Sequence, residues 1–289
     1  MHNENLIIAP WKDYELLDSG NNLKLERFAD YILIRPETQA LWAPLHPELW
    51  DKAQAEFSFH DSKGGWKKYD MPESWEMVWD DVKFSLRLTS FKHTGIFPEQ
   101  AANWEWLQPR VAALQQPKIL NLFGYTGIAS LVAAKKGAMV THLDASKQSN
   151  TWARDNSILS GTPEGSIRYI TDDAMRFAER EIRRGTIYDG IILDPPAFGR
   201  GPEGEVFRIE EHLPSLLDVL SQLLSKKPGS FFLLNGYAAG YAPQSLLQSV
   251  EGSFPEMKTL KDAGFGELHL QESNSDRKVA SGIYVRFVR

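Results

Sequence analysis

A short apolar run that ends in a glycine turn and continues into a helix constrains the fold of this chain more than any other stretch. The residues are Lys118 to Gly127, KILNLFGYTG, and an apolar helical run follows them directly. Residues 119–122 have the character of a buried strand, and Gly124 and Gly127 allow a tight turn and the close approach of a ligand. The pattern therefore predicts a strand, a turn and a helix N-terminus, the first unit of an α/β fold.

Two classes of nucleoside cofactor are compatible with such a turn. Dinucleotide sites carry the pattern G-x-G-x-x-G, so that the helix N-terminus holds a pyrophosphate. Here Phe123 and Tyr125 occupy positions where a pyrophosphate needs space. An adenosyl ligand without phosphates, such as S-adenosylmethionine, fits this turn better. The alternative is a strand-to-helix turn that binds no ligand, and motifs elsewhere in the chain are needed to distinguish the two.

Acidic residues follow three further predicted strands. Asp144 ends the strand 138–143, where a carboxylate can accept hydrogen bonds from both hydroxyls of a ribose. Asp172 and Asp173 end the strand 166–171; a carboxylate there can accept a hydrogen bond from an adenine amino group or simply cap the next helix. Asp194 ends the strand 188–193. Because the carboxyl ends of parallel strands meet at one edge of a sheet, we expect these acids to lie near one ligand.

The segment Asp194 to Gly201, DPPAFGRG, has the most distinctive chemistry. Two consecutive prolines stiffen the backbone and leave their carbonyls free to accept hydrogen bonds from a substrate. Phe198 can stack on a planar group. Residues 199–204 are expected to form a mobile lid that carries Arg200. The alternative interpretation is an ordinary Asp-Pro turn with a buried Phe.

Composition excludes several kinds of site. The chain has no cysteine, which excludes disulfides, thiolate metal sites and a cysteine nucleophile. Its net charge of −6 is carried by residues 1–90, and the remainder is balanced, which argues mildly against an extended nucleic-acid clamp. No secretory leader and no run long enough to span a membrane are apparent, so we expect a cytoplasmic protein without a membrane or metal partner.

The order of predicted elements indicates two domains. Short runs at 14–17, 22–28 and 31–35 read as a β meander, so residues 1–88 are predicted to form a small β-rich accessory domain. Residues 89–289 alternate strands and helices and end in the strands 267–271 and 283–288, which we expect to form an antiparallel hairpin at the sheet edge. The predicted fold class is α/β, a doubly wound sheet preceded by a small mainly β domain.

Four motifs together resemble a known family. LNLFGYTG, LDAS, DDA and DPPAFGRG occur in the order and spacing of the class I S-adenosylmethionine-dependent methyltransferases, whose sheet is Rossmann-like. The subtype is similar to bacterial 23S ribosomal RNA methyltransferases with a DPPxF motif, and FKHTGIFPEQ resembles their loop before the first helix. The resemblance covers residues 91–289.

The resemblance implies the site residues. Those expected to face the methyl acceptor and act in catalysis are Asp194, Pro195 and Phe198. Those expected to bind S-adenosylmethionine are Gln100, Asn121, Phe123, Gly124, Tyr125, Thr126, Gly127, Asp144, Ala145, Ser146, Asp172, Asp173 and Ala174.

The absence of cysteine also limits the mechanism. Members of this family that methylate C5 of cytosine need a cysteine thiolate, so direct transfer to an atom with a lone pair, such as a ring or exocyclic nitrogen, remains. Ala197 stands between the prolines and Phe198, unlike the exocyclic-amine enzymes, which leaves the acceptor atom open. We expect an RNA substrate, in particular ribosomal RNA, although the charge of the chain does not itself indicate one. The alternatives are a methyltransferase for a small molecule or protein and a binding module without turnover. The sequence does not define the oligomeric state.

Overall fold

The computed structural model describes residues 2–60, 63–237 and 240–289 and divides into two compact units. One unit comprises residues 1–6, 103–267 and 282–289, and the other comprises 7–102 and 268–281. Contacts therefore group residues 89–102 and 268–281 with the N-terminal strands. The division into two independently folding domains, with a boundary after residue 88, stays a prediction.

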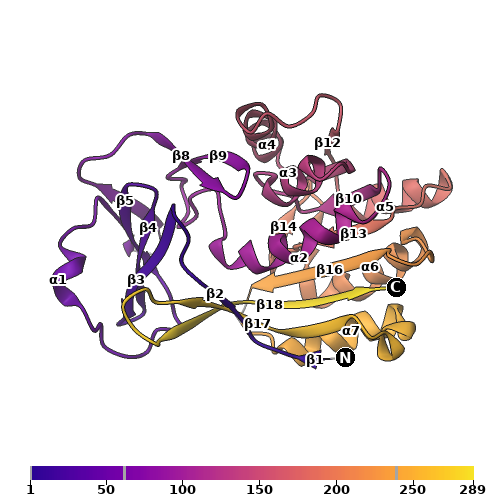
Figure 1. Ribbon diagram of the computed structural model, residues 1–289. Coiled ribbons are helices and arrows are strands. Elements are labelled where there is room, and N and C mark those ends of the chain that lie inside the picture. Colours follow the sequence, from indigo (N-terminus) through magenta and orange to yellow (C-terminus); the bar gives the residue numbers. More distant parts are fainter. Residues whose placement is uncertain (1, 61–62, 238–239) are drawn as a thin grey trace. The chain divides into compact units, whose positions relative to one another are not determined.

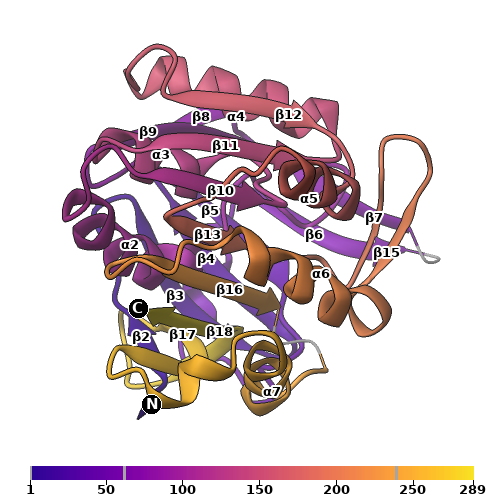
Figure 2. The ribbon, with the colours of Figure 1, turned by 90° about the vertical axis from the view of Figure 1, so that its right-hand side faces the viewer.

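The first unit is built on a mainly parallel sheet whose strand order is β1-β17-β18-β16-β13-β10-β11-β12, with β2 paired to β17. Figure 2 shows these strands one beside the next from β12 to β17. The five central strands are mutually parallel, and β18 runs antiparallel to β16. The strands are β1 (His2–Asn3), β2 (Leu6–Ile8), β10 (Lys118–Leu122), β11 (Met139–Asp144), β12 (Ile167–Thr171), β13 (Gly190–Leu193), β16 (Phe231–Tyr237), β17 (Ala263–Gln271) and β18 (Lys278–Val288).

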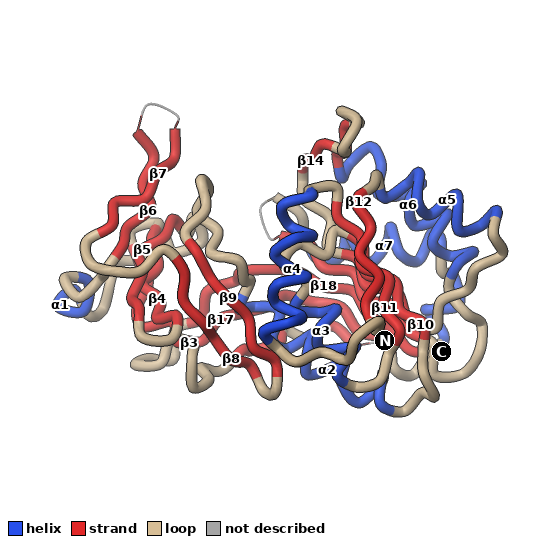
Figure 3. Tube along the Cα trace, turned by 90° about the horizontal axis from the view of Figure 1, so that it is seen from above, coloured by secondary structure: helices blue, strands red, loops and turns tan. Residues whose placement is uncertain are grey.

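Helices cover both faces of this sheet. Figure 3 shows α2, α3 and α4 on one face and α5, α6 and α7 on the other. Parallel strands covered on both faces are apolar along their whole length, which explains the buried run of β13 and most of β10. The helical elements are α2 (Ala101–Ala112), α3 (Ile128–Lys135), α4 (Lys147–Leu159), α5 (Ala174–Arg183), α6 (Ile209–Leu223), α7 (Pro243–Ser253) and η2 (Pro255–Thr259).

One hydrophobic core of this unit lies between the sheet and the second helical layer. Leu120, Phe177, Leu217 and Phe232 belong to one cluster of buried side chains contributed by β10, α5, α6 and β16. Burial of each such side chain stabilises the fold by roughly 1.5–3 kcal/mol. The core thus fixes the strand ends on which the predicted site depends.

The second unit is mainly β, as predicted. Its five-stranded sheet has the order β3-β4-β5-β6-β7, and β8 pairs with β9 (Figure 1). The three runs that predict a meander form β3, β4 and β5, which pair antiparallel. The elements are β3 (Tyr14–Gly20), β4 (Leu23–Phe28), β5 (Tyr31–Pro36), α1 (Pro47–Trp50), β6 (Ala55–His60), β7 (Lys63–Lys68), β8 (Ser74–Trp79), β9 (Val82–Arg87) and η1 (Pro98–Gln100).

The C-terminal hairpin is longer than the sequence predicts. β17 and β18 are hydrogen-bonded neighbours joined by residues 272–277 only, so they run antiparallel. The polar character of 278–282 predicts a loop there, but Val279 and Ser281 are buried and lie within β18. A serine that is buried by pairing in a strand cannot be distinguished from a loop serine by composition.

Candidate functional site

The carboxyl ends of the central strands lie at one edge of the large sheet, here called the carboxyl edge. Register pairs Leu122 of β10 with Leu143 of β11 and with Leu193 of β13, and it pairs Asp144 with Thr171 of β12. The four predicted motifs therefore begin at corresponding positions on adjacent strands. In an open α/β sheet this edge is where ligands bind.

The turn after β10 has an unusual backbone. Phe123 and Tyr125 have φ angles of 57° and 50°, and Gly127, which precedes α3, has a φ of 88°. The N–H of Gly124 donates to the carbonyl of Leu143, which ties the turn to β11 at 2.9 Å. Two non-glycine residues in the left-handed region are costly and persist only where the surrounding structure demands it, as at ligand sites.

The structure adds a reason for glycine at position 124 that the sequence does not show. A Cβ there would lie 2.3 Å from Cε1 of His142, so the missing side chain makes room for a buried protein ring. His142 in turn contacts the Ser130 hydroxyl at 2.9 Å, and Ser130 accepts a hydrogen bond from the Asn121 amide at 2.8 Å. Burial lowers the pKa of His142 to about 4, so the ring is neutral at pH 7. Asn121 is buried, and its role in cofactor binding stays a prediction.

Asp144 is held by backbone donors. One carboxylate oxygen accepts from the N–H of Tyr125 at 2.9 Å, and the other accepts from the N–H of Ser146 at 2.8 Å. Burial raises the pKa of Asp144, although these two hydrogen bonds oppose the shift. Among the described residues none forms an ion pair with this carboxylate. Its oxygens therefore keep lone pairs for a ligand with hydroxyl donors.

The neighbours of Asp144 open the next helix. The hydroxyl of Ser146 accepts from the N–H of Ser149 and caps α4, while Ala145 links the strand to this cap. On the other side of the turn, the carbonyl of the buried Thr126 accepts from the Asn156 amide of α4 at 3.0 Å. The turn is thus fixed from both of its ends.

The two acids after β12 have separate partners. Asp173 accepts from the N–H of Arg176 at 2.9 Å and caps α5, whose first residue, Ala174, is buried. Asp172 forms ion pairs with Arg176, at 2.7 Å, and with Arg180. Burial acts to raise the pKa of Asp172, but the hydrogen bonds from both arginines outweigh it and hold the pKa below its usual range. Capping, the simpler of the two alternatives, is therefore present, and contact with adenine stays a prediction.

The DPPAFGRG segment begins at the same edge and then folds back as a ribbon. The N–H of Asp194 donates to the carbonyl of Leu122 at 3.4 Å, which places Asp194 next to the start of the glycine turn. Pro195 is buried, whereas the side chain of Phe198 is 53% exposed. The flanks of the expected lid pair antiparallel as β14 (Phe198–Arg200) and β15 (Val206–Arg208), so residues 201–205 form the turn of a ribbon. The mobility of this turn stays a prediction. Phe198 is therefore not the buried side chain of a plain Asp-Pro turn.

Sequence reasoning did not foresee what holds this ribbon. Arg176 of α5 pairs with Glu203 at 2.6 Å and with Glu205 at 3.1 Å, while Phe207 contacts the ring of Phe123 with centroids 5.0 Å apart. The spacing of Asp172, Arg176 and Arg180 at intervals of four is a signal for a paired helix face. Nothing in the sequence pairs Arg176 with the ribbon, because the contact is not local.

Gln100 lies in the other compact unit. It ends η1, which follows the FKHTGIF stretch, and it is buried. Its predicted contact with the cofactor stays a prediction.

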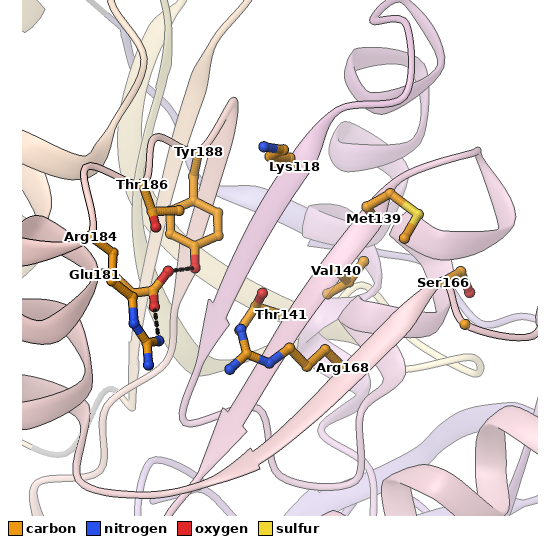
Figure 4. A pocket seen from close by; sticks show the side chains of 11 residues that line it. Lys118, Met139, Val140, Thr141, Ser166, Arg168, Glu181, Arg184, Thr186 and Tyr188 are labelled. Carbon is orange, nitrogen blue, oxygen red and sulfur yellow. Dashed lines mark hydrogen bonds and ion pairs between the residues drawn. The ribbon is translucent and has the colours of Figure 1, made fainter.

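A cavity of about 510 Å³ lies at the opposite, amino edge of the same sheet (Figure 4). Glu181 of α5 accepts hydrogen bonds there from the Tyr188 hydroxyl at 2.8 Å and from Arg184 at 2.7 Å. The basic side chains of Lys118 and Arg168 also line it. None of the predicted site residues lines this cavity.

Comparison with known proteins identifies the family. A model of S-adenosylmethionine-dependent methyltransferases matches residues 52–260. A solved S-adenosylmethionine-dependent methyltransferase from Agrobacterium tumefaciens is 40% identical, with a TM-score of 0.91, over 98% of this chain and 93% of that one. This chain belongs to the S-adenosylmethionine-dependent methyltransferases. It is therefore a methyltransferase whose cofactor is S-adenosylmethionine.

Two further relatives are informative for different reasons. SMU.776, a putative methyltransferase solved in complex with SAH, shares the fold at 18% identity, with a TM-score of 0.74 over 96% of this chain and 76% of that one. A ribosomal RNA large subunit methyltransferase K/L from Shewanella baltica is 35% identical over 148 residues, 50% of this chain. The match spans only 20% of that relative, so this chain corresponds to a small part of it.

The residues at the carboxyl edge fit this cofactor. S-adenosylmethionine is a cation without phosphates, and the turn 123–127 carries no basic residue, while Asp144 offers lone pairs for a ribose. The described residues contain no group of three or more His, Asp or Glu that would hold a metal ion. In the described part of the chain, no helix is long and apolar enough to cross a membrane.

Proposed function

We propose that this methyltransferase modifies a base of RNA, in particular ribosomal RNA, by direct transfer to a nitrogen. The observation that carries the proposal is the position of Asp194 and Pro195 at the end of β13, next to the glycine turn of β10. The similarity of 148 residues to a ribosomal RNA large subunit methyltransferase K/L supports RNA as the acceptor class. A ribosomal substrate also agrees with the predicted cytoplasmic location.

The residues of the site have separate proposed roles. S-adenosylmethionine supplies an electrophilic methyl group when it is bound. We assign the ribose to Asp144 and an adenine contact to Asp173, next to the turn that includes Phe123, Gly124 and Tyr125. The other predicted contacts are Gln100, Asn121, Thr126, Gly127, Ala145, Ser146, Asp172 and Ala174.

The acceptor would be held by the DPPAF segment. The carboxylate of Asp194 and the carbonyl of Pro195 accept the hydrogens of an amino or ring N–H group, which directs the nitrogen lone pair toward the methyl group. Phe198 stacks on the base and fixes its plane. The nitrogen would gain the methyl group as the bond between that group and the sulfonium sulfur breaks, S-adenosylhomocysteine would leave as the thioether, and the nitrogen would release a proton to water. Catalysis then rests mostly on positioning, which supplies large rate factors without a covalent enzyme intermediate.

Labelled methyl transfer tests the proposal. Total RNA, total protein and small-molecule extract from cells that lack this protein are each incubated with labelled S-adenosylmethionine and the enzyme. We expect label in RNA that ribonuclease releases. If only protein or only small molecules are labelled, RNA is not the acceptor class. If the protein binds the cofactor but labels none of the three fractions, the proposed methyl transfer is contradicted.

A further inference from the structure

The ribbon β14–β15 has two unlike faces. Residues opposite each other in an antiparallel pair share a face, so Phe198 lies beside Arg208, and Arg200 lies beside Val206. This outer face is open, since Phe198 and Val206 are 53% and 40% exposed and both arginines are exposed.

The inner face of the ribbon is anchored in the same unit. Phe207 packs on Phe123, and a Cβ at Gly199 would lie only 3.2 Å from Pro196, so glycine lets the ribbon lie close to the proline pair. The N–H of Ile209 donates to the carbonyl of Ala197 at 3.1 Å. The ribbon is thus attached directly to the segment that begins at Asp194.

Charges on the ribbon are segregated. The acids of its turn, Glu203 and Glu205, pair with Arg176 of α5 at 2.6 Å and 3.1 Å. None of the described residues forms an ion pair with Arg200, whose guanidinium lies 6.0 Å from the centre of the Phe198 ring. Among the described residues, the guanidinium of Arg208 forms one ion pair, a long contact of 3.5 Å with Glu211, and both of these side chains are more than half exposed. The outer face therefore presents two cations beside an aromatic ring.

Such a face has the chemistry that single-stranded nucleic acid requires. Guanidinium groups bind phosphates through paired N–H donors, and an exposed ring stacks on a base of any sequence. Binding of nucleic acid at such a face is compatible with the net charge of −6, because the contact depends on local cations and not on the charge of the whole chain.

We propose that the outer face of the ribbon binds the sugar–phosphate backbone of the substrate beside the methylated base, through Arg200 and Arg208. This inference rests on the proposed RNA function. In this arrangement Phe198 stacks on the methylated base, as in the proposed function, while the two arginines contact the phosphates on either side of that base. The ribbon is then the element that recognises the substrate as a nucleic acid.

The test uses the full chain and the variants Arg200→Ala, Arg208→Ala and their combination. Methyl transfer is measured with total RNA from cells lacking the protein, and binding is measured with a fluorescent single-stranded RNA of mixed sequence at several salt concentrations. Arg183→Ala is the matched control, since Arg183 is an exposed arginine in the last turn of α5. S-adenosylmethionine affinity reports whether each variant is folded.

We expect the double variant to raise KM for RNA about tenfold, as two phosphate contacts are lost, and to leave cofactor affinity unchanged. The slope of log affinity against log salt should fall by about 0.7 for each phosphate contact removed. Arg183→Ala should change neither quantity. If the unmodified enzyme methylates RNA but the double variant keeps its KM and salt slope, the ribbon assignment is wrong. If the unmodified enzyme neither binds nor methylates RNA, the proposed function itself fails.

Discussion

The carboxyl and amino edges of the large sheet differ in what contacts their carboxylates, the half-buried Asp144 and the buried Glu181. At the amino edge, Glu181 is bound by Arg184 and Tyr188; burial acts to raise its pKa, but these hydrogen bonds outweigh it and lower the pKa. At the carboxyl edge, Asp144 has two backbone donors, no ion pair among described residues and a raised pKa. A carboxylate satisfied by a cation supports the fold, whereas one that keeps lone pairs is available to a ligand.

Acids at the carboxyl edge also differ in whether a cation already pairs with them. Asp172 follows β12 but resembles Glu181, because Arg176 and Arg180 both pair with it. Arg176 also holds the two acids of the ribbon. Through Arg176, Asp172 therefore links a strand of the carboxyl edge to the ribbon, and position at this edge alone does not make an acid available to a ligand.

The largest effect expected is on methyl transfer. Asp194→Ala should abolish transfer, a loss of at least about 100-fold in kcat, because the acceptor is no longer held in line. Asp189 precedes the same strand at its amino edge and accepts from the N–H of Lys118, so Asp189→Ala is the matched control and should retain activity. Single-turnover transfer with saturating cofactor measures both variants. Equal activity of the two would remove Asp194 from the mechanism.

A pH effect on stability should come from the ring beneath the carboxyl edge. Burial lowers the pKa of His142 in the folded protein to about 4, whereas a histidine of the unfolded chain has a pKa of about 6.5. Between these two pH values the unfolded chain binds a proton at His142 and the folded protein does not. The free energy of unfolding is therefore unaffected by this residue above pH ~6.5, and it falls by up to about 3 kcal/mol as the pH is lowered to ~4. Urea unfolding of His142→Gln should show a flatter profile over this window.

His2→Gln, at an exposed histidine, is the control for this measurement. Burial also lowers the pKa of His93 to about 4, and its contribution persists in both variants. An identical profile for His142→Gln and the unmodified protein would show that His142 is not held neutral by the fold.

A smaller effect should distinguish packing from ligand contact at the turn. Gly124→Ala forces a methyl group against His142 and should cost about 1–3 kcal/mol of stability and weaken cofactor binding. His142→Ala removes the ring, so Gly124→Ala should cost much less stability and affinity in the His142→Ala background than in the unmodified protein. The four proteins of this cycle are compared by calorimetric titration with S-adenosylmethionine. If the affinity cost of Gly124→Ala is the same in both backgrounds, the ligand and not His142 requires the glycine.

Local patterns were sufficient to predict the central parallel strands of the large sheet, but not β1 and β2 at its edge. The apolar run before Gly124, the acid at the end of β11 and the serine cap of α4 each concern residues close together in sequence, and the structure has all three. The strands β3 to β5 follow equally from short runs separated by turns. Family resemblance added the cofactor, which the comparisons support.

Contacts between distant residues were not predictable in this way. A Cβ at Gly124 would clash with His142, and an arginine that holds the ribbon lies on α5. A run such as residues 199–204 reads as a loop, since glycines and a proline dominate it, yet pairing of its flanks makes a ribbon. Only the folded arrangement shows which acids are already paired and which keep lone pairs.

Calorimetric titration of S-adenosylmethionine into Asp144→Ala and Arg168→Ala tests most directly whether the cofactor binds at the carboxyl edge. Arg168 lines the cavity at the amino edge and is exposed, so its loss leaves the fold intact. We expect Asp144→Ala to weaken binding by about 1–3 kcal/mol through the loss of charge-assisted hydrogen bonds, and Arg168→Ala to bind as the unmodified protein does. Unchanged affinity in Asp144→Ala together with weakened binding in Arg168→Ala would place the cofactor at the amino edge and contradict the site proposed here.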